Sequence, residues 1–231
     1  MVVDPGDAQV VIEHALKIQK QLTAIIVTHH HADHTGGIAA LVDHFGDLAV
    51  HGPVNSPYRG LTHSVKEGDE VDILGTHFTV IEIPGHTLDH IAYYNQQQGL
   101  LFCGDTLFLA GCGRVFEGTA PQMHHSLSKL MALPAMTKAY PTHEYSLANL
   151  KFAMAVDGDN ESLKLAQKMC QEIRDQNEVT LPTRLVQESA INPFVRTHDK
   201  AVIASAERYK GQALTSADEV FAALREWKNS F

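Results

Sequence analysis

Residues 28–34 have the sequence Thr-His-His-His-Ala-Asp-His, the densest group of metal-binding residue types in the chain. It follows a β-branched run that predicts a buried strand, and it precedes a Gly-Gly pair at which a helix is expected to begin. Because alternate residues of an extended loop face the same side, His29 and His31 can converge. Asp33 and His34 follow where the chain turns into the helix. Four nitrogen and oxygen donors in so short a loop exceed what one catalytic zinc takes from it, so the stretch predicts a site for two metal ions.

Three further donors stand in similar local settings. His86 lies in Pro-Gly-His-Thr, Asp105 in Cys-Gly-Asp-Thr and His143 in Pro-Thr-His-Glu, each just beyond an expected strand. Loops gather at strand ends, where their side chains can converge. Alone, each residue is more typical of a turn, but together with the first cluster they are expected ligands. Since a carboxylate can bind one ion with each oxygen, Asp105 is the natural bridge.

The sequence contains 15 histidines, and most of them are not expected to bind metal. His30 is expected to neighbour the site without being a ligand. The others have no convergent partner in the sequence and are interpreted as solvated or hydrogen-bonded: His14, His44, His51, His63, His77, His90, His124, His125 and His198.

Composition excludes several classes of protein. The 231 residues carry 18 Lys+Arg against 27 Asp+Glu, a net charge of −9, which argues against a nucleic-acid or anionic-membrane partner. No apolar stretch approaches the length of a membrane span, and the N-terminus lacks the features of a signal peptide. Three scattered cysteines argue against a disulfide framework, so a cytoplasmic protein is expected.

The pattern of short strands and helices changes after about residue 145, where helices follow one another. We therefore expect an α/β metal-binding catalytic domain over residues 1–145 and a helical domain over 146–231. The expected strands are 23–28, 48–51, 70–74, 77–83, 91–95, 100–103 and 138–142. The expected helices are 7–22, 36–45, 125–132, 146–155, 163–176, 200–208 and 216–229.

The motifs described above, in their order, resemble the metallo-β-lactamase superfamily. More narrowly, Gly-Cys-Gly-Arg-Val-Phe-Glu-Gly-Thr at residues 111–119 and the ending Arg-Glu-Trp-Lys-Asn-Ser-Phe at 225–231 resemble glyoxalase II, the hydroxyacylglutathione hydrolases. The resemblance implies an αββα sandwich followed by helices. It also implies a division of the ligands: His29, His31 and His86 on one ion, Asp33, His34 and His143 on the other, and Asp105 on both.

The resemblance further implies residues that support this site. Asp4, in Asp-Pro-Gly, would orient a ligand, although the sequence suits a turn or cap residue nearly as well. Arg114, Phe116, Tyr145, Arg225 and Lys228 would contact glutathione. Without the resemblance, Arg225 and Lys228 would read as a solvated helix end.

The chemistry implied is thioester hydrolysis. The two ions are expected to be zinc, with iron or manganese as alternatives, and they would share a hydroxide beside Asp33 and Asp105. That hydroxide would attack the thioester carbonyl of S-(2-hydroxyacyl)glutathione. The products would be glutathione and a hydroxy acid such as D-lactate. No covalent acyl-enzyme is then expected, and Cys103 and Cys112 are bystanders.

One departure from the family leaves alternatives open. Members usually carry a pair of strands before the segment equivalent to residues 2–6, and this sequence starts at that segment. Without that pair, an edge of the sheet is expected to be exposed and open to association. An inactive metal-binding protein is one alternative. A glutathione-persulfide dioxygenase with one iron is another, and an RNA phosphodiesterase is a third that the acidic charge disfavours.

Overall fold

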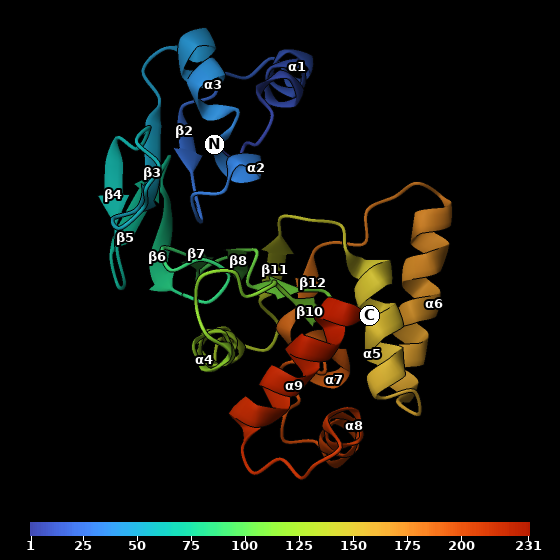
Figure 1. Ribbon diagram of the computed structural model, residues 1–231. Coiled ribbons are helices and arrows are strands. Elements are labelled where there is room, and N and C mark those ends of the chain that lie inside the picture. Colours follow the sequence, from blue (N-terminus) through green and yellow to red (C-terminus); the bar gives the residue numbers. More distant parts are fainter.

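The computed structural model describes all residues 1–231 and contains two main β-sheets (Figure 1). The first sheet has four parallel strands in the order in which they occur in the chain. They are β1 (Val2–Val3), β2 (Ala24–Ile26), β3 (Ala49–Pro53) and β4 (His63–Val65).

The second sheet has six strands in the order β12-β11-β8-β7-β6-β5. The β8 and β11 strands are parallel and the other neighbours are antiparallel. The strands are β5 (Glu70–Ile73), β6 (Thr76–Glu82), β7 (Ile91–Asn95), β8 (Leu100–Gly104), β11 (Lys138–Pro141) and β12 (Thr183–Arg184). A small hairpin of β9 (Leu107–Phe108) and β10 (Gly111–Cys112) follows β8.

Helices cover the outer faces of the two sheets. Two of the three helices before β3 pack on the four-stranded sheet, and the later ones lie on the side of the six-stranded sheet (Figure 1). The helices are α1 (Ala8–Ile18), α2 (Ala32–Thr35), α3 (Ile38–Phe45), α4 (Ala120–Met131), α5 (Ser146–Val156), α6 (Glu161–Asp175), α7 (Leu185–Ile191), α8 (Lys200–Lys210) and α9 (Ala217–Ser230). None of them is long and apolar enough to cross a membrane.

Alternation of side chains along the strands builds these layers. In β2, Ile25 faces the helices, whereas Ile26 faces the second sheet, because successive side chains of a strand point to opposite faces. In β7, Tyr93 lies between the sheets, and Tyr94 packs toward α4 and the C-terminal helices. The expected αββα sandwich is therefore confirmed.

The C-terminal helices share the core of the six-stranded sheet. Phe221 and Leu224 of α9 lie in the same apolar cluster as Leu127 of α4 and Leu101 of β8. The helical region is thus packed on the sheet, and its last helix reaches the edge at which the loops carrying the metal donors meet.

Most expected elements are confirmed, with differences at their ends. The expected helix 7–22 ends at Ile18, because Gln19 adopts a left-handed conformation with φ of 53°. Helix α4 begins earlier than expected, because Thr119 and Gln122 form a capping box before it. The short elements α2, α7, β4, β9, β10 and β12 had not been expected.

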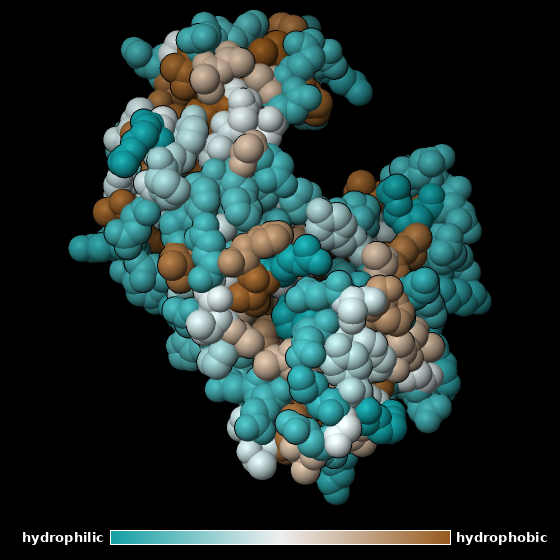
Figure 2. Space-filling model, viewed as in Figure 1, coloured by the Kyte–Doolittle hydropathy of each residue, from teal (hydrophilic) through white to brown (hydrophobic).

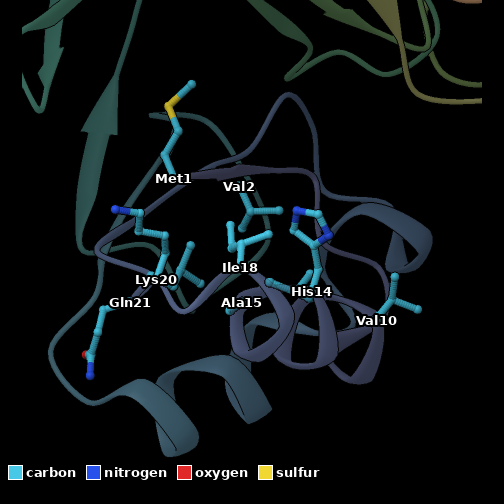
Figure 3. Close-up of a pocket in the computed structure, with 10 residues that line it drawn as sticks. Met1, Val2, Val10, His14, Ala15, Ile18, Lys20 and Gln21 are labelled. Atoms are coloured by element: carbon cyan, nitrogen blue, oxygen red, sulfur yellow. The ribbon is translucent and has the colours of Figure 1, made fainter.

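The sheet edge expected to be exposed is formed by β1, whose only partner is β2. Beside it, Val2 lines a cavity of about 300 Å³ with Ala15 and Ile18 of α1, and Met1 and Lys20 stand at its rim (Figure 3). Apolar atoms also gather over this N-terminal lobe in Figure 2, which shows the surface hollowed between the lobe and helices α5 and α6. Association through this edge stays a prediction.

Candidate metal centre

The expected metal donors lie on loops that meet at one edge of the two sheets. His29 follows β2, His86 lies between β6 and β7, Asp105 follows β8 and His143 follows β11. Since β8 and β11 are parallel, their carboxyl ends reach the same edge, which brings Asp105 and His143 together. Residues far apart in the sequence therefore meet in one place.

Three imidazoles form the first group of donors. His31 Nδ1 lies 3.1 Å from His29 Nε2 and 3.1 Å from His86 Nε2. These three residues form one of the clusters whose ligand atoms all lie within 4.8 Å of one another. His30 contacts Asp89 at 2.9 Å and Glu117 at 3.3 Å, and with His31 and Glu117 it forms a further cluster within the same limit, so its exclusion from the ligands stays a prediction.

The hydrogen bonds behind these imidazoles fix which nitrogen carries the proton. His86 Nδ1 donates to the Arg114 carbonyl at 2.7 Å, so its Nε2 presents a lone pair. His29 Nδ1 lies 3.1 Å from the hydroxyl of Thr28, which donates its own proton to Asp4, so His29 Nε2 also presents a lone pair. Because His31 Nδ1 carries at most one proton for two facing lone pairs, this arrangement suits a cation.

The second group contains His34, His143 and Asp33, another cluster within the same 4.8 Å limit. Asp33 Oδ2 lies 3.3 Å from His143 Nε2 and 3.8 Å from His34 Nε2. Of these residues, His34 is fully buried and Asp33 is exposed. The exposed carboxylate leaves this side of the centre open toward solvent.

Asp105 stands between the two groups. Its Oδ1 lies 3.4 Å from His34 Nε2, and its Oδ2 lies 3.5 Å from both His86 Nε2 and His143 Nε2. Buried His34 Nε2 and Asp105 Oδ1 have no hydrogen-bond partner. Buried polar atoms left unpaired are costly, so these orphaned atoms fit a divalent cation that both would bind.

The acid–base behaviour of these side chains reflects their crowding. Burial lowers the pKa of His34, but the carboxylates of Asp105, 3.4 Å from Nε2, and Asp4, 3.0 Å from Nδ1, outweigh it and raise the pKa to about 10. A hydrogen bond to Asp105 raises the pKa of His143. Burial, and then the neighbouring histidines, hold the pKa of His29 far below its ordinary value. Without a cation, protons on His34 and His143 therefore balance the Asp105 charge.

Asp4 supports the centre from behind. It is buried, and its carboxylate accepts the backbone N–H and the hydroxyl of Thr28, each at 2.7 Å. The same carboxylate lies 3.0 Å from His34 Nδ1. Asp4 therefore lies against one histidine and the residue preceding another, and its role in orienting a ligand stays a prediction.

Close backbone contacts explain why glycine stands beside two of these donors. A Cβ on Gly113 would lie 1.9 Å from the Asp105 carbonyl oxygen and 3.2 Å from His86 Nδ1. A Cβ on Gly104, which has φ of 48°, would lie 2.4 Å from the Thr28 hydroxyl. The donors converge only because these two positions lack side chains.

A cavity of about 820 Å³ opens over the donors and is lined by all five expected glutathione contacts. The Phe116 ring lies 5.3 Å from the His86 ring, and Tyr145 stacks on His143 at 5.0 Å. Arg114 is exposed at the rim, where its guanidinium forms no hydrogen bond or ion pair within the chain.

The two cations of α9 are not a solvated helix end. Arg225 is 8% exposed, and its Nη1 donates to the carbonyls of Cys112 at 2.9 Å and Gly113 at 3.3 Å, whereas its buried Nε has no partner. Lys228 is half-buried and donates to the Ala148 carbonyl at 3.1 Å. Burial, with the nearby Arg225 charge, lowers the pKa of Lys228.

Sequence reasoning missed one residue of the centre. His90 is hydrogen-bonded, which is one of the two expectations for it, but it is also 1% exposed and stacks on His29 with ring centroids 4.6 Å apart, which the sequence did not predict. Burial lowers its pKa to about 3. The available signal was its position four residues after His86, directly before an expected strand.

Comparison with known proteins assigns the family. Residues 1–143 match the metallo-β-lactamase superfamily, and residues 144–231 match the hydroxyacylglutathione hydrolase C-terminus. Over 232 residues, the chain is 48% identical to a hydroxyacylglutathione hydrolase of Pseudomonas aeruginosa (strain LESB58), with 100% of this chain and 90% of that protein covered. The chain belongs to the hydroxyacylglutathione hydrolase family. A hydroxyacylglutathione hydrolase of Vibrio cholerae serotype O1 (strain M66-2) is 47% identical over the same shares of each chain.

Solved structures agree with the fold. ETHE1 from Myxococcus xanthus superposes with a TM-score of 0.67 at 25% identity, covering 98% of this chain and 80% of that one. The BLEG-1 B3 metallo-β-lactamase shares the fold, with a TM-score of 0.63 at 23% identity over 84% of this chain and 88% of that one. With the clustered donors, membership in the hydroxyacylglutathione hydrolase family shows that this protein binds divalent metal.

Proposed function

We propose that this protein is a thioesterase that hydrolyses S-(2-hydroxyacyl)glutathione, with S-D-lactoylglutathione as the substrate that yields glutathione and D-lactate. The observation that carries the proposal is the cavity of about 820 Å³, in which metal donors and the cations Arg114 and Lys228 face one space. A glutathione thioester needs both, because it has a carbonyl to be attacked and carboxylates to be bound. Such an enzyme serves to degrade methylglyoxal.

Two divalent ions, zinc in the first instance, are proposed to occupy the centre. His29, His31 and His86 would hold one ion, Asp33, His34 and His143 would hold the other, and Asp105 would contact both. When bound, the ions would supply Lewis acidity and lower the pKa of bound water toward about 7. The convergence of unpaired lone pairs and of the orphaned Asp105 Oδ1 supports this assignment.

The residues around the donors keep them aligned for this chemistry. The Arg114 carbonyl holds the His86 ring by accepting from Nδ1, and Asp4 holds His34. Such partners fix the orientation of metal-binding histidines and increase their basicity. Asp33, exposed at the cavity, and Asp105 are the carboxylates proposed to take part in generating the nucleophile.

Substrate contacts are proposed for the residues on the opposite wall. The Arg114 guanidinium lies over the Phe116 ring, 5.8 Å from its centroid, and forms no hydrogen bond or ion pair, so its donors are available to a glutathione carboxylate. Lys228 offers a further donor in the same cavity, and the positive charge of Arg225, which also lines it, is proposed to attract the carboxylates of glutathione. Phe116 and Tyr145, each about half exposed, provide apolar surface beside the reacting carbonyl.

No cysteine is proposed to attack the substrate. Burial raises the pKa of both Cys103 and Cys112, although the neighbouring Arg225 opposes the shift at Cys112. Thiols held in their neutral form are poor nucleophiles. The leaving thiolate needs no strong acid, since an ordinary thiol has a pKa of about 8.5.

We also propose a two-domain division at residues 1–145 and 146–231. It is supported by the two family matches, which meet between residues 143 and 144. In this division the first domain supplies the metal donors and the second supplies the cations of α9.

Loss of thioester absorbance with zinc-loaded protein and S-D-lactoylglutathione tests the proposed activity. Asp105→Ala should abolish turnover and weaken binding of both ions, whereas His125→Ala, at an exposed position away from the centre, should change neither. A wild-type protein with two bound ions and no turnover would contradict the proposal. Oxygen uptake with one bound iron would instead favour the persulfide dioxygenase alternative.

A further inference from the structure

His90 occupies a position that links three parts of the metal centre. It directly precedes β7, and its ring lies parallel to the His29 ring, with an interplanar angle of 14°. Its backbone carbonyl accepts the Ile83 N–H at 2.9 Å and closes the loop that carries His86. The His90 side chain therefore packs against the donor His29, and its backbone carbonyl closes the loop that carries the donor His86.

The ring nitrogens of His90 have distinct partners. The backbone N–H of Asp105 donates to His90 Nε2 at 3.1 Å. On the other side of the ring, His90 Nδ1 donates to the Ile91 carbonyl at 3.1 Å. Because a backbone amide can only donate, Nε2 must present its lone pair, and the proton of the neutral ring stays on Nδ1.

The end of β8 is shaped to bring Asp105 against this ring. A Cβ on Gly104 would lie 2.7 Å from His90 Cε1 and 2.9 Å from Nε2. Only glycine lets the backbone pass so close to the imidazole, and its φ of 48° turns the chain toward it. The contact is thus built from both sides, by a residue without a side chain and by a buried acceptor.

We propose that His90 is a positioning residue for Asp105. By accepting the Asp105 N–H, it fixes the backbone from which the carboxylate extends between the two groups of donors. The inference rests on the proposed metal site, and His90 acts through Asp105 without touching the substrate. An acceptor at this point is needed because the buried amide has no other hydrogen-bond partner.

Two variants of the full chain separate the acceptor from the aromatic ring. His90→Phe keeps a ring against His29 but has no acceptor, whereas His90→Gln keeps an acceptor without the ring. We expect His90→Phe to weaken Zn²⁺ binding by about 10- to 100-fold, as measured by competition with a chromophoric chelator, and His90→Gln to weaken it less. Thermal unfolding in a chelator checks that both variants are folded.

The order of the two variants decides between positioning and packing. If His90 only fills space, His90→Gln should lose more affinity than His90→Phe, and that order would overturn the proposal. Wild-type affinity in folded His90→Phe would overturn it while leaving the metal site intact. Failure of the wild-type chain to bind zinc would instead remove the metal site itself, and the inference with it.

A measurement on the wild-type chain does not depend on the variants folding. Nitrogen-15 chemical shifts of the zinc-loaded protein, labelled at histidine, report which ring nitrogen of His90 carries the proton. We expect protonated Nδ1 and unprotonated Nε2. A proton on Nε2 would overturn the proposal, because that nitrogen could not accept the Asp105 amide.

Discussion

Glu188 gives the chain a pH-dependent stability that one substitution should remove. The side chain is fully buried in α7 and accepts the backbone N–H of Ala110 at 2.9 Å, the amide of Asn192 at 2.9 Å and the hydroxyl of Thr183 at 2.5 Å. These hydrogen bonds favour the charged form, but burial outweighs them and raises the pKa to about 7. Neutral Glu188 would have its proton between its own oxygen and the Thr183 hydroxyl.

The sign and size of the effect follow from this pKa. In the unfolded chain Glu188 loses its proton near pH 4.5, whereas in the folded chain it does so near pH 7. The folded state therefore binds more protons between these values, and its contribution to stability, complete below pH 4.5, is lost as the pH rises to about 7. At about 1.4 kcal/mol per pH unit, the loss amounts to about 3 kcal/mol as an upper figure.

Glu188→Gln should remove this loss, because glutamine is neutral at every pH and can donate to the Thr183 hydroxyl. Urea unfolding of both proteins in a chelator, between pH 4.5 and 8.5, measures the difference in unfolding free energy. We expect that difference to shift in favour of Glu188→Gln by up to about 3 kcal/mol as the pH rises. A difference that stays constant with pH would refute the reasoning, because Glu188 would then titrate alike in both states.

Three further outcomes are expected. Lys228→Ala should raise KM for S-D-lactoylglutathione by about 10-fold or more with a smaller change in kcat, since it removes a cation from the wall of the cavity and not from the metal centre. Lys168→Ala, at an exposed position on α6, should leave KM unchanged. If the two substitutions changed KM equally, Lys228 would not be a substrate-binding residue. Because the pKa of His34 is raised to about 10, zinc must displace a proton from this side chain, and zinc affinity should therefore rise with pH. Calorimetry in buffers of different ionisation enthalpy should detect the released proton. Zinc binding without proton release would show that His34 is not protonated in the metal-free protein. Sedimentation velocity should detect concentration-dependent association through the edge at β1, weakened by Ile18→Lys, and a monomer at every concentration would exclude it.

The regular elements could be read from the sequence where residues that favour strands or helices were continuous. Strand β7 was predicted in this way, and its residues alternately face the other sheet and the helices, so that both sets are buried. Ends were harder to locate. The apolar stripe of α1 continues beyond Ile18 to Leu22, but Leu22 packs into the same core from a loop. A periodic pattern records which side chains are buried, and it does not record where the backbone leaves the helix.

The expected metal donors could be proposed from the sequence because residues 28–34 place several donors in one short loop. His86, Asp105 and His143, each typical of a turn when taken alone, became expected ligands only together with that loop. His90 and Glu188 could not be found in this way, since their roles come from backbone groups that lie far away in the sequence. Their partners are the amides of Asp105 and Ala110, and no side-chain pattern identifies a backbone amide.

These long-range contacts converge on the segment that joins β8 to the substrate cavity. From the helical region, Glu188 holds the amide of Ala110 and Arg225 holds the carbonyls of Cys112 and Gly113. Gly113 in turn packs against the carbonyl of Asp105.

The helical region therefore does more than supply cations to the cavity. It fixes the backbone on which the carboxylate between the two groups of donors depends. Because Arg225 is buried in these contacts, removing its guanidinium would disturb the metal centre as well as the substrate wall. Lys228 donates to the Ala148 carbonyl and lies over the rings of Phe152 and Phe231, with no hydrogen bond to the backbone around Asp105. It therefore separates the two effects, and it is the residue at which substrate binding can be measured with the least disturbance of the metal centre.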